Sequence, residues 1–341
     1  MNNEEKTSES FLDALLLKKI ANPTIELLTD MSPEQLAASH FMDLLEKAKG
    51  MKAIKTSVVH PTDKESLEGA LRSAQLGLIE PILIGPESKI EKVAKKYNLD
   101  LKNYKIIDVE HSHKAAEKGV ELARTGEVGA VMKGALHTDE LMGEVVNKDR
   151  GLRTERRMSH AFLMSVSTFP KPFIITDAAI NIRPTLSEKR DILQNSIDLM
   201  HTLGIDNPKV AILSAVETIN EKIPATIDAA SLCKMADRGQ IIGATLDGPL
   251  AFDNAISLLA AESKGIRSKV SGNADILLVP DLESGNMLAK QLKYLAKALV
   301  AGIVIGTRVP IILTSRSDPT DMRVISCVLA MLMHYNAKTK F

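Results

Sequence analysis

From Met51 onward, short runs of β-branched and aliphatic residues alternate with amphipathic segments, and this alternation constrains the fold more than any other feature of the chain. Strands that alternate with helices cross over into parallel sheets, so the pattern predicts an α/β architecture. About ten strands are many for one open sheet, and we therefore expect two α/β domains with mostly parallel sheets. The predicted strands are residues 53–59, 81–84, 105–109, 130–132, 173–176, 209–213, 241–246, 276–279, 301–305 and 310–314.

The amphipathic segments between these strands predict helices. Ser187 is a candidate N-cap for a long helix, and Asp318 followed by Pro319 places a second N-cap directly after a strand. Residues 1–50 contain apolar clusters but no strand pattern, so we treat them as a helical extension. The predicted helices are residues 63–75, 114–125, 187–203, 224–235, 253–262, 284–299 and 319–335.

Composition excludes several classes of protein. Lys plus Arg and Asp plus Glu both total 43, and aromatic residues make up only 3% of the chain, which argues against nucleic-acid binding. The two cysteines form no CxxC pair, so a reducing compartment fits better than a disulfide scaffold. The N-terminus is acidic, and the longest apolar stretch is about half the roughly 20 residues of a membrane span. We expect a cytoplasmic protein that does not bind membranes.

The common cofactor fingerprints are absent, including G-x-G-x-x-G, G-x-x-x-x-G-K-[ST] and H-E-x-x-H. His111 and His113 lack a third nearby ligand, so no metal site and no tightly bound cofactor is predicted. Polar residues do gather where predicted strands end. In an open parallel sheet this is where ligands bind, because helix N-termini and loop amides point there.

The segment KGALHTDELMG is the first such place. Lys133 and Gly134 end a strand, and His137 and Thr138 open a helix. Gly134 would let backbone amides approach an anion, and Lys133 would supply positive charge. A helix cap beside an exposed lysine explains the same residues without a ligand.

Three arginines crowd the turn before a further strand in GLRTERRMSHAFLM. Guanidinium groups donate bidentate hydrogen bonds to phosphate, so Arg153, Arg156 and Arg157 suit a phosphate or the phosphorylated adenosine of coenzyme A. A solvated turn or a subunit contact is an equal alternative. Asn181, Asp247 and Gly248 follow other strands and are ligand candidates, although Asn, Asp and Gly are also ordinary turn residues.

The strongest candidate is VPIILTSRSDPTDMRV. Here a buried strand delivers Ser315 and Arg316 to the start of the last helix, so a hydroxyl, a guanidinium and free helix amides converge. Asp318 has two interpretations, as an N-cap and as a carboxylate beside a phosphate site.

Taken together, these segments resemble the phosphate acetyl/butyryltransferase family, most closely its phosphate butyryltransferase branch. The resemblance extends from Lys52 to the C-terminus through KGALHTDELMG, LRTERRMSH, TDAAINIRP, KMADRGQI, DGPLAFDNAIS, ADILLVPDLESGNM and LTSRSD. It implies two α/β domains with the active site in an interdomain cleft, similar to isocitrate dehydrogenase. Domain I would comprise residues 51–160 plus 305–341, and domain II residues 161–304.

The resemblance also implies an activity: short-chain acyl-coenzyme A and phosphate interconvert with acyl phosphate and coenzyme A in a ternary complex. Ser315 and Arg316 match the serine–arginine pair of acetyltransferase relatives, and Asn286 joins the substrate-binding candidates. The aspartate base of those relatives falls on Met322 here, so Asp318 or Asp321 would have to replace it. The resemblance implies a homodimer or larger homo-oligomer. The alternative is a non-catalytic protein that binds coenzyme A or a phosphate ligand on the same scaffold.

Overall fold

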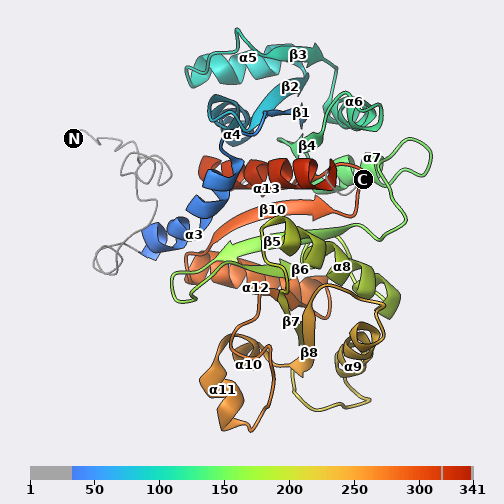
Figure 1. Ribbon diagram of the computed structural model, residues 1–341. Coiled ribbons are helices and arrows are strands. Elements are labelled where there is room, and N and C mark those ends of the chain that lie inside the picture. Colours follow the sequence, from blue (N-terminus) through green and yellow to red (C-terminus); the bar gives the residue numbers. More distant parts are fainter. Residues whose placement is uncertain (1–32, 316–317, 339–341) are drawn as a thin grey trace.

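The computed structural model describes residues 33–315 and 318–338 and shows helices packed on both faces of one long sheet (Figure 1). The strands are β1 Ile54–Val59, β2 Ile79–Gly85, β3 Lys105–Asp108, β4 Ala130–Lys133, β5 Ser159–Ser165, β6 Phe173–Thr176, β7 Lys209–Leu213, β8 Thr245–Leu250, β9 Ile276–Leu278, β10 Leu299–Ile305 and β11 Ile311–Ile312. The predicted α/β architecture is confirmed.

The sheet has eleven strands in the order β3-β2-β1-β4-β11-β10-β5-β6-β9-β7-β8. Most neighbours are parallel, but β10 is antiparallel to both β11 and β5, and β5 is antiparallel to β6. The expectation of separate sheets is wrong, because Ile303 pairs with Ile312 and Val304 with Ile311. This short antiparallel contact joins the two parallel parts into one sheet.

The helices follow the predicted positions with some corrections. Thr185, not Ser187, is the N-cap of α8, because the Thr185 hydroxyl accepts a hydrogen bond from the Glu188 amide. The predicted helix 253–262 is broken at Ser257, and the sequence prediction omitted α5. The helices are α3 Pro33–Ala48, α4 Lys64–Gln75, α5 Glu87–Lys96, α6 Ser112–Arg124, α7 Thr138–Val145, α8 Leu186–Thr202, α9 Pro224–Asp237, α10 Phe252–Ile256, α11 Leu258–Ser263, α12 Leu282–Leu295 and α13 Thr320–Lys338.

Successive residues of the central strands point to opposite faces of the sheet and pack into two cores. On one face, Val131 of β4 packs in a core with residues of α6 and α7. On the other face, the next residue, Met132, packs in a core with residues of α4 and α13. Figure 1 shows α13, in red, running alongside β10. Helices therefore cover both sides of β4 and leave the strand ends as the place for ligands.

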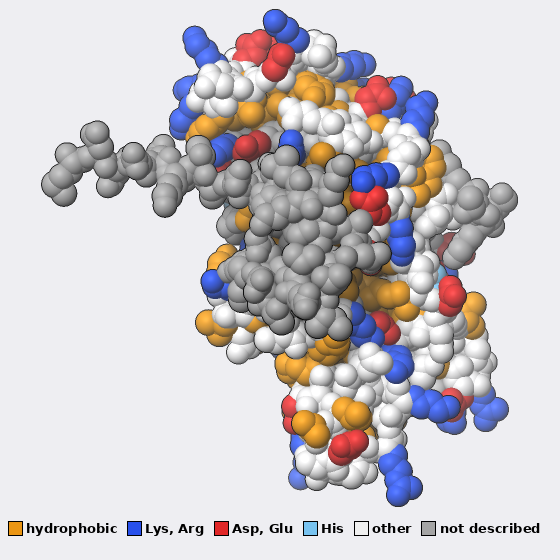
Figure 2. Space-filling view, turned by 60° about the vertical axis from the view of Figure 1, so that its left-hand side comes forward, with side chains coloured by type: hydrophobic (Ala, Val, Ile, Leu, Met, Phe, Trp, Pro, Cys, Tyr) orange, Lys and Arg blue, Asp and Glu red, His pale blue; other side chains and the backbone are white. Residues whose placement is uncertain are grey.

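Helix α3 lies within the segment predicted as a helical extension, and it packs on the main body through the buried ring of Phe41. The rest of that segment, residues 1–32, lies outside the described residues. None of the helices in the described part of the chain is long and apolar enough to cross a bilayer. Figure 2 shows basic and acidic side chains interspersed on the face it presents, in keeping with the equal charge totals.

Candidate active site

The ends of β4 and β11 bring two of the predicted segments together. The two strands are parallel neighbours, and Ile312 pairs with Met132. Because the next residues continue side by side, Leu313 follows next to Lys133, and Ser315 lies two residues further along. The Lys133–Gly134 loop and the turn that begins at Ser315, called here the Ser315 turn, therefore lie at the same edge of the sheet.

The Lys133–Gly134 loop is fixed to the end of β1. The amide of Gly134 donates to the carbonyl of Val59 at 2.9 Å, and the amide of Ala135 donates to the carbonyl of His60 at 2.8 Å. A Cβ atom on Gly134 would lie 2.4 Å from the Val59 oxygen, so only glycine fits this close approach. Lys133 is buried, in contrast to the exposed lysine of the alternative interpretation. Its ammonium group donates to the Gly134 carbonyl at 3.4 Å, so positive charge lies at the end of β4.

The next residues start α7. His137 is the N-cap, and its amide donates to Glu140 at 3.2 Å, while Thr138 is the first helical residue. The Glu140 carboxylate also accepts from Ser112 of α6, and these hydrogen bonds lower the pKa of Glu140. His137 and Thr138 thus have a structural role in capping α7, at the same sheet edge as Lys133.

The Ser315 turn combines an exposed serine with buried charged residues. Ser315 is exposed, whereas Asp318 and Asp321 are each 5% exposed. One carboxylate oxygen of Asp318 forms an ion pair with Lys293 of α12, and the other accepts a 2.6 Å hydrogen bond from the Ser315 amide. Both oxygens of Asp318 are therefore engaged in holding the turn. Arg316, the other half of the predicted pair, lies outside the described residues.

The arginine turn lies elsewhere. Arg153 forms a β-bridge with Thr307, which lies just after the C-terminal end of β10. The amide of Leu313 donates to the carbonyl of Gly302 within β10, and the chain continues from there toward the N-terminal end of β10 and the Ser315 turn. About six residues of strand, or roughly 20 Å, separate these two places. The structure does not bring the arginine turn to the Ser315 turn.

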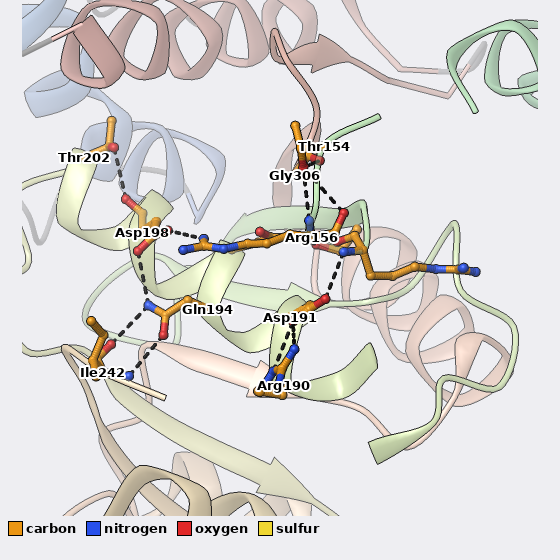
Figure 3. A network of polar contacts seen from close by, with 12 residues as sticks. Thr154, Arg156, Arg190, Asp191, Gln194, Asp198, Thr202, Ile242 and Gly306 are labelled. Carbon is orange, nitrogen blue, oxygen red and sulfur yellow. Dashed lines mark hydrogen bonds and ion pairs between the residues drawn. The ribbon is translucent and has the colours of Figure 1, made fainter. Parts of the chain in front are cut away.

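Partners within the chain already compensate two of these guanidinium groups. Arg156 donates to the Asp198 carboxylate at 2.5 Å, and Figure 3 shows that the side chain of Gln194, also of α8, donates to the same carboxylate. The Thr202 hydroxyl donates to the main-chain carbonyl of Asp198. Arg157 contacts Glu188 at 3.2 Å and Asn181 at 2.6 Å. Two of the three arginines of this turn are therefore paired with carboxylates of α8.

A cavity of about 500 Å³ adjoins the arginine turn. Its walls include Thr154 and Arg156, Asn195 and Asp198 of α8, and Met333 of α13. A second hollow of about 560 Å³ shares Ile305, Thr307 and Met333 with it and runs along the starts of β1 and β11. Both lie at the sheet edge opposite the Ser315 turn.

The buried Asn181 and the half-buried Asn286 belong to a network of hydrogen bonds at the end of β6. Asp177 accepts from the amides of His160, Ala179 and Ile180, and from the side chain of Asn181. Asn286 of α12 donates to the Ala178 carbonyl at 3.1 Å. These contacts close the loop after β6, so both asparagines have structural partners.

Asp247 and Gly248 lie on β8, the last strand of the sheet, and five strands separate them from β11 in the sheet order. Asp247 accepts from the Gly248 amide at 2.8 Å. A Cβ atom on Gly248 would lie 2.8 Å from Ile212 of β7, so the glycine permits close packing. The structure does not bring this pair to the Ser315 turn.

Three residues that sequence reasoning did not select contact this region. Lys293 pairs with Asp318, Arg323 of α13 binds the main chain of Ser315, and His160 of β5 lies 3.4 Å from the carbonyl of Leu313. Lys293 and Arg323 lie in amphipathic helices, where charged residues usually indicate a solvated face. The sequence did contain one signal for Arg323. It lies about one helical turn after Pro319, at the junction between a strand and the last helix.

Among the described residues, no group of three or more His, Cys, Asp or Glu side chains is arranged to hold a metal ion. The fold is that of the phosphotransacylases. A branched-chain phosphotransacylase from Enterococcus faecalis V583 superposes with a TM-score of 0.72 at 30% identity, over 83% of this chain and 99% of that one. A phosphotransacetylase from Streptococcus pyogenes, at 24% identity and a TM-score of 0.74 over 90% of this chain and 100% of that one, shares the fold.

Sequence relatives narrow the class further. The family model described as phosphate acetyl/butaryl transferase matches residues 112–331. A phosphate acetyltransferase from Rickettsia felis is 65% identical over 342 residues, covering 100% of this chain and 98% of its own length. A phosphate butyryltransferase from Clostridium acetobutylicum is 41% identical over 296 residues, covering 87% of this chain and 98% of its own. The chain belongs to the phosphate acetyl/butyryltransferase family.

Proposed function

We propose that this protein is a phosphate acyltransferase that interconverts short-chain acyl-coenzyme A and phosphate with acyl phosphate and coenzyme A. Family membership supports the reaction class. The observation that carries the proposal for this chain is the parallel pairing of β4 with β11, which places the buried Lys133 beside the Ser315 turn. A buried cation, a glycine-lined strand end and an exposed hydroxyl suit a phosphate group.

The proposed chemistry is direct transfer between the two substrates. A base removes the thiol proton of coenzyme A, and the sulfur attacks the carbonyl carbon of the acyl phosphate. The bond from that carbon to the phosphate oxygen then breaks, so that thioester and inorganic phosphate form. A free thiol has a pKa of about 8.5, so a nearby base raises the thiolate fraction at neutral pH. Lys133 and Arg316 hold the phosphate, and Ser315 donates to the developing negative charge.

Asp321 is our preferred base. It is 5% exposed and lies in the first turn of α13, close in sequence to the Ser315 turn. Asp318 is the weaker candidate, because Lys293 and the Ser315 amide occupy its two oxygens. Arg153 and Arg156 remain proposed contacts for the far end of coenzyme A, at the opposite end of β10 from the Ser315 turn.

The two-domain division belongs to the same proposal. Residues 51–160 plus 305–341 would form one domain and residues 161–304 the other, with an isocitrate dehydrogenase-like cleft between them. The limited pairing of β10 with β11 supports a division at this point in the sheet. We also propose a homo-oligomer in the cytoplasm. The exposed apolar side chains Met287, Tyr294 and Leu295 on α12 support self-association, which sedimentation velocity would test.

A thiol-release assay tests the activity. Purified protein receives acetyl-, propionyl- or butyryl-coenzyme A with and without phosphate, and hydroxylamine traps the acyl phosphate. We expect thiol release that depends on phosphate, and initial-velocity lines that intersect when both substrates are varied. Parallel lines would indicate a covalent acyl-enzyme. Saturable binding of coenzyme A without any thiol release would replace the proposal by the non-catalytic alternative.

A further inference from the structure

Arg323 lies directly behind the Ser315 turn. It is 1% exposed and belongs to α13. One guanidinium nitrogen donates to the hydroxyl of Thr314 at 2.7 Å, and the other donates to the carbonyl of Ser315 at 3.0 Å. The planar guanidinium therefore fixes two consecutive residues at the point where the chain leaves β11.

The neighbouring helix leaves room for this side chain. A Cβ atom on Gly69 of α4 would lie 2.6 Å from Cδ of Arg323. Glycine inside a helix makes that helix less stable than alanine would. Gly69 therefore leaves space for Arg323 beneath the Ser315 turn, although it makes α4 less stable.

The charge of Arg323 has no direct counter-ion in the described part of the chain. No carboxylate oxygen there lies within ion-pair distance of its guanidinium, and Nε is buried without a hydrogen-bond partner. Asp63, Asp318 and Glu65 act on it only from further away, and burial lowers the pKa of the group. A buried cation without an adjacent anion is costly, and an apolar side chain of similar size would pack there with less penalty.

An anion bound nearby would offset the cost of burying the charge of Arg323. The exposed residue that Arg323 contacts is Ser315, since Leu313 and Thr314 are buried. We propose that Arg323 is a positioning residue of the phosphate site: its two hydrogen bonds fix Ser315 at the sheet edge, and its charge strengthens phosphate binding there. This inference rests on the proposed function, because it assigns phosphate to the Ser315 turn.

Two substitutions separate the roles of charge and shape. R323M keeps most of the side-chain volume and removes the charge, whereas R323K keeps the charge and loses the paired hydrogen bonds. We expect R323M to raise the KM for phosphate about tenfold or more, with less than a twofold change in the KM for acetyl-coenzyme A, and R323K to lie between R323M and wild type. The melting temperature of R323M is expected to stay equal or to rise. R308M removes an exposed arginine at the opposite edge of the sheet and serves as the matched control.

The proposal is overturned if R323M leaves the KM for phosphate unchanged, or if both KM values and the melting temperature change together, as a purely structural residue would cause. If R323M does not fold, T314V tests the same contact, and an unchanged KM for phosphate in T314V then refutes it. Calorimetric titration with inorganic phosphate keeps the inference separate from the proposed activity. A wild-type protein without turnover would end the acyltransferase proposal, whereas weaker phosphate binding by R323M than by wild type would still support the role of Arg323.

Discussion

The backbone amide of Ser315 donates a 2.6 Å hydrogen bond to the side chain of Asp318, so a buried carboxylate sets the conformation of the turn that carries the exposed hydroxyl. The second oxygen of the same carboxylate pairs with Lys293. Lys293 belongs to α12, which precedes β10, whereas Ser315 follows β11. The ion pair therefore connects the Ser315 turn to α12, the helix that precedes the neighbouring strand β10.

Removing either member of this pair leaves the other charge buried, because the side chains of Lys293 and Asp318 are only 16% and 7% exposed. We expect K293M and D318N each to lower the free energy of unfolding by about 3–5 kcal/mol, and the double variant to lose less than the sum. Urea denaturation measures this. K290M, which alters an exposed lysine on the same helix, is the control and should change little. Additive single effects would show that the ion pair contributes nothing.

The same variants distinguish a positioning role of Asp318 from a base. If Asp318 only holds the turn, K293M and D318N lower kcat to a similar extent and leave the pH dependence of kcat/KM in place. D321N, by contrast, should lower kcat by about 10²-fold or more. Full activity in D321N together with inactive D318N would assign the base to Asp318 instead.

Gly134 provides a test of the loop opposite the Ser315 turn. A methyl group there would meet the Val59 oxygen at 2.4 Å and the His60 oxygen at 2.7 Å, both main-chain atoms that cannot rotate away. We expect G134A to lower the free energy of unfolding by about 1–3 kcal/mol and to weaken phosphate binding. A methyl group at Gly143 of α7 would meet no atom within 4 Å beyond its own helix among the described residues, so G143A should be neutral or stabilise by up to about 1 kcal/mol. Equal stability of the two variants would contradict the close approach.

Local signals were enough to predict much of the framework. The strands that end at Lys133 and the run leading to Ser315 are apolar segments closed by glycine or polar residues, and both the strands and their place at one sheet edge agree with the structure. The α/β class follows from the same periodicity. Strand order was not predictable in this way. The pairing of β10 with β5 joins residues more than a hundred positions apart in the sequence, and local patterns do not show such contacts.

The charged residues show the same limit. The three neighbouring arginines fitted an anion site or a solvated turn equally well from sequence, and in the structure Asp198 and Glu188 of α8 pair with Arg156 and Arg157. Conversely, Arg323 was not selected from the sequence, and its side chain is buried against Gly69 of α4. Whether a charge is compensated by its own fold or available to a ligand is decided by tertiary contacts, which a single sequence does not contain.

Direct transfer predicts that neither cysteine takes part in the reaction. Burial raises the pKa of Cys327 to about 12, and burial together with Asp247 and Asp237 raises the pKa of Cys233 to about 12. Only roughly 10⁻⁴ of each thiol is then ionised at pH 8. We expect the native protein to react slowly with Ellman's reagent, both thiols to react after denaturation, and C233A/C327A to keep near wild-type turnover. Loss of turnover on brief alkylation of native protein, absent in the double variant, would implicate a thiol.

His160 predicts how stability depends on pH. It is fully buried in β5, and burial lowers its pKa from the ordinary value near 6.5, although Asp177 and Asp318 act in the opposite direction. Below about pH 6.5 the unfolded chain therefore binds a proton that the folded protein does not, so stability falls as the pH decreases, by up to about 1.4 kcal/mol per pH unit from this group. The effect continues down to the lowered pKa of the folded state.

H160Q removes this contribution from both states. We expect its free energy of unfolding, measured in urea from pH 7.5 to 5, to fall less steeply than that of wild type. H113Q alters an exposed histidine and should keep the wild-type slope. The buried Nδ1 of His160 has no partner within the described residues, so the neutral ring already leaves one polar atom unsatisfied, and protonation would add a charge at the same place. If H160Q and wild type lose stability in parallel as the pH falls, the imidazole takes up its proton in the folded protein as readily as in the unfolded chain, and the burial argument is wrong.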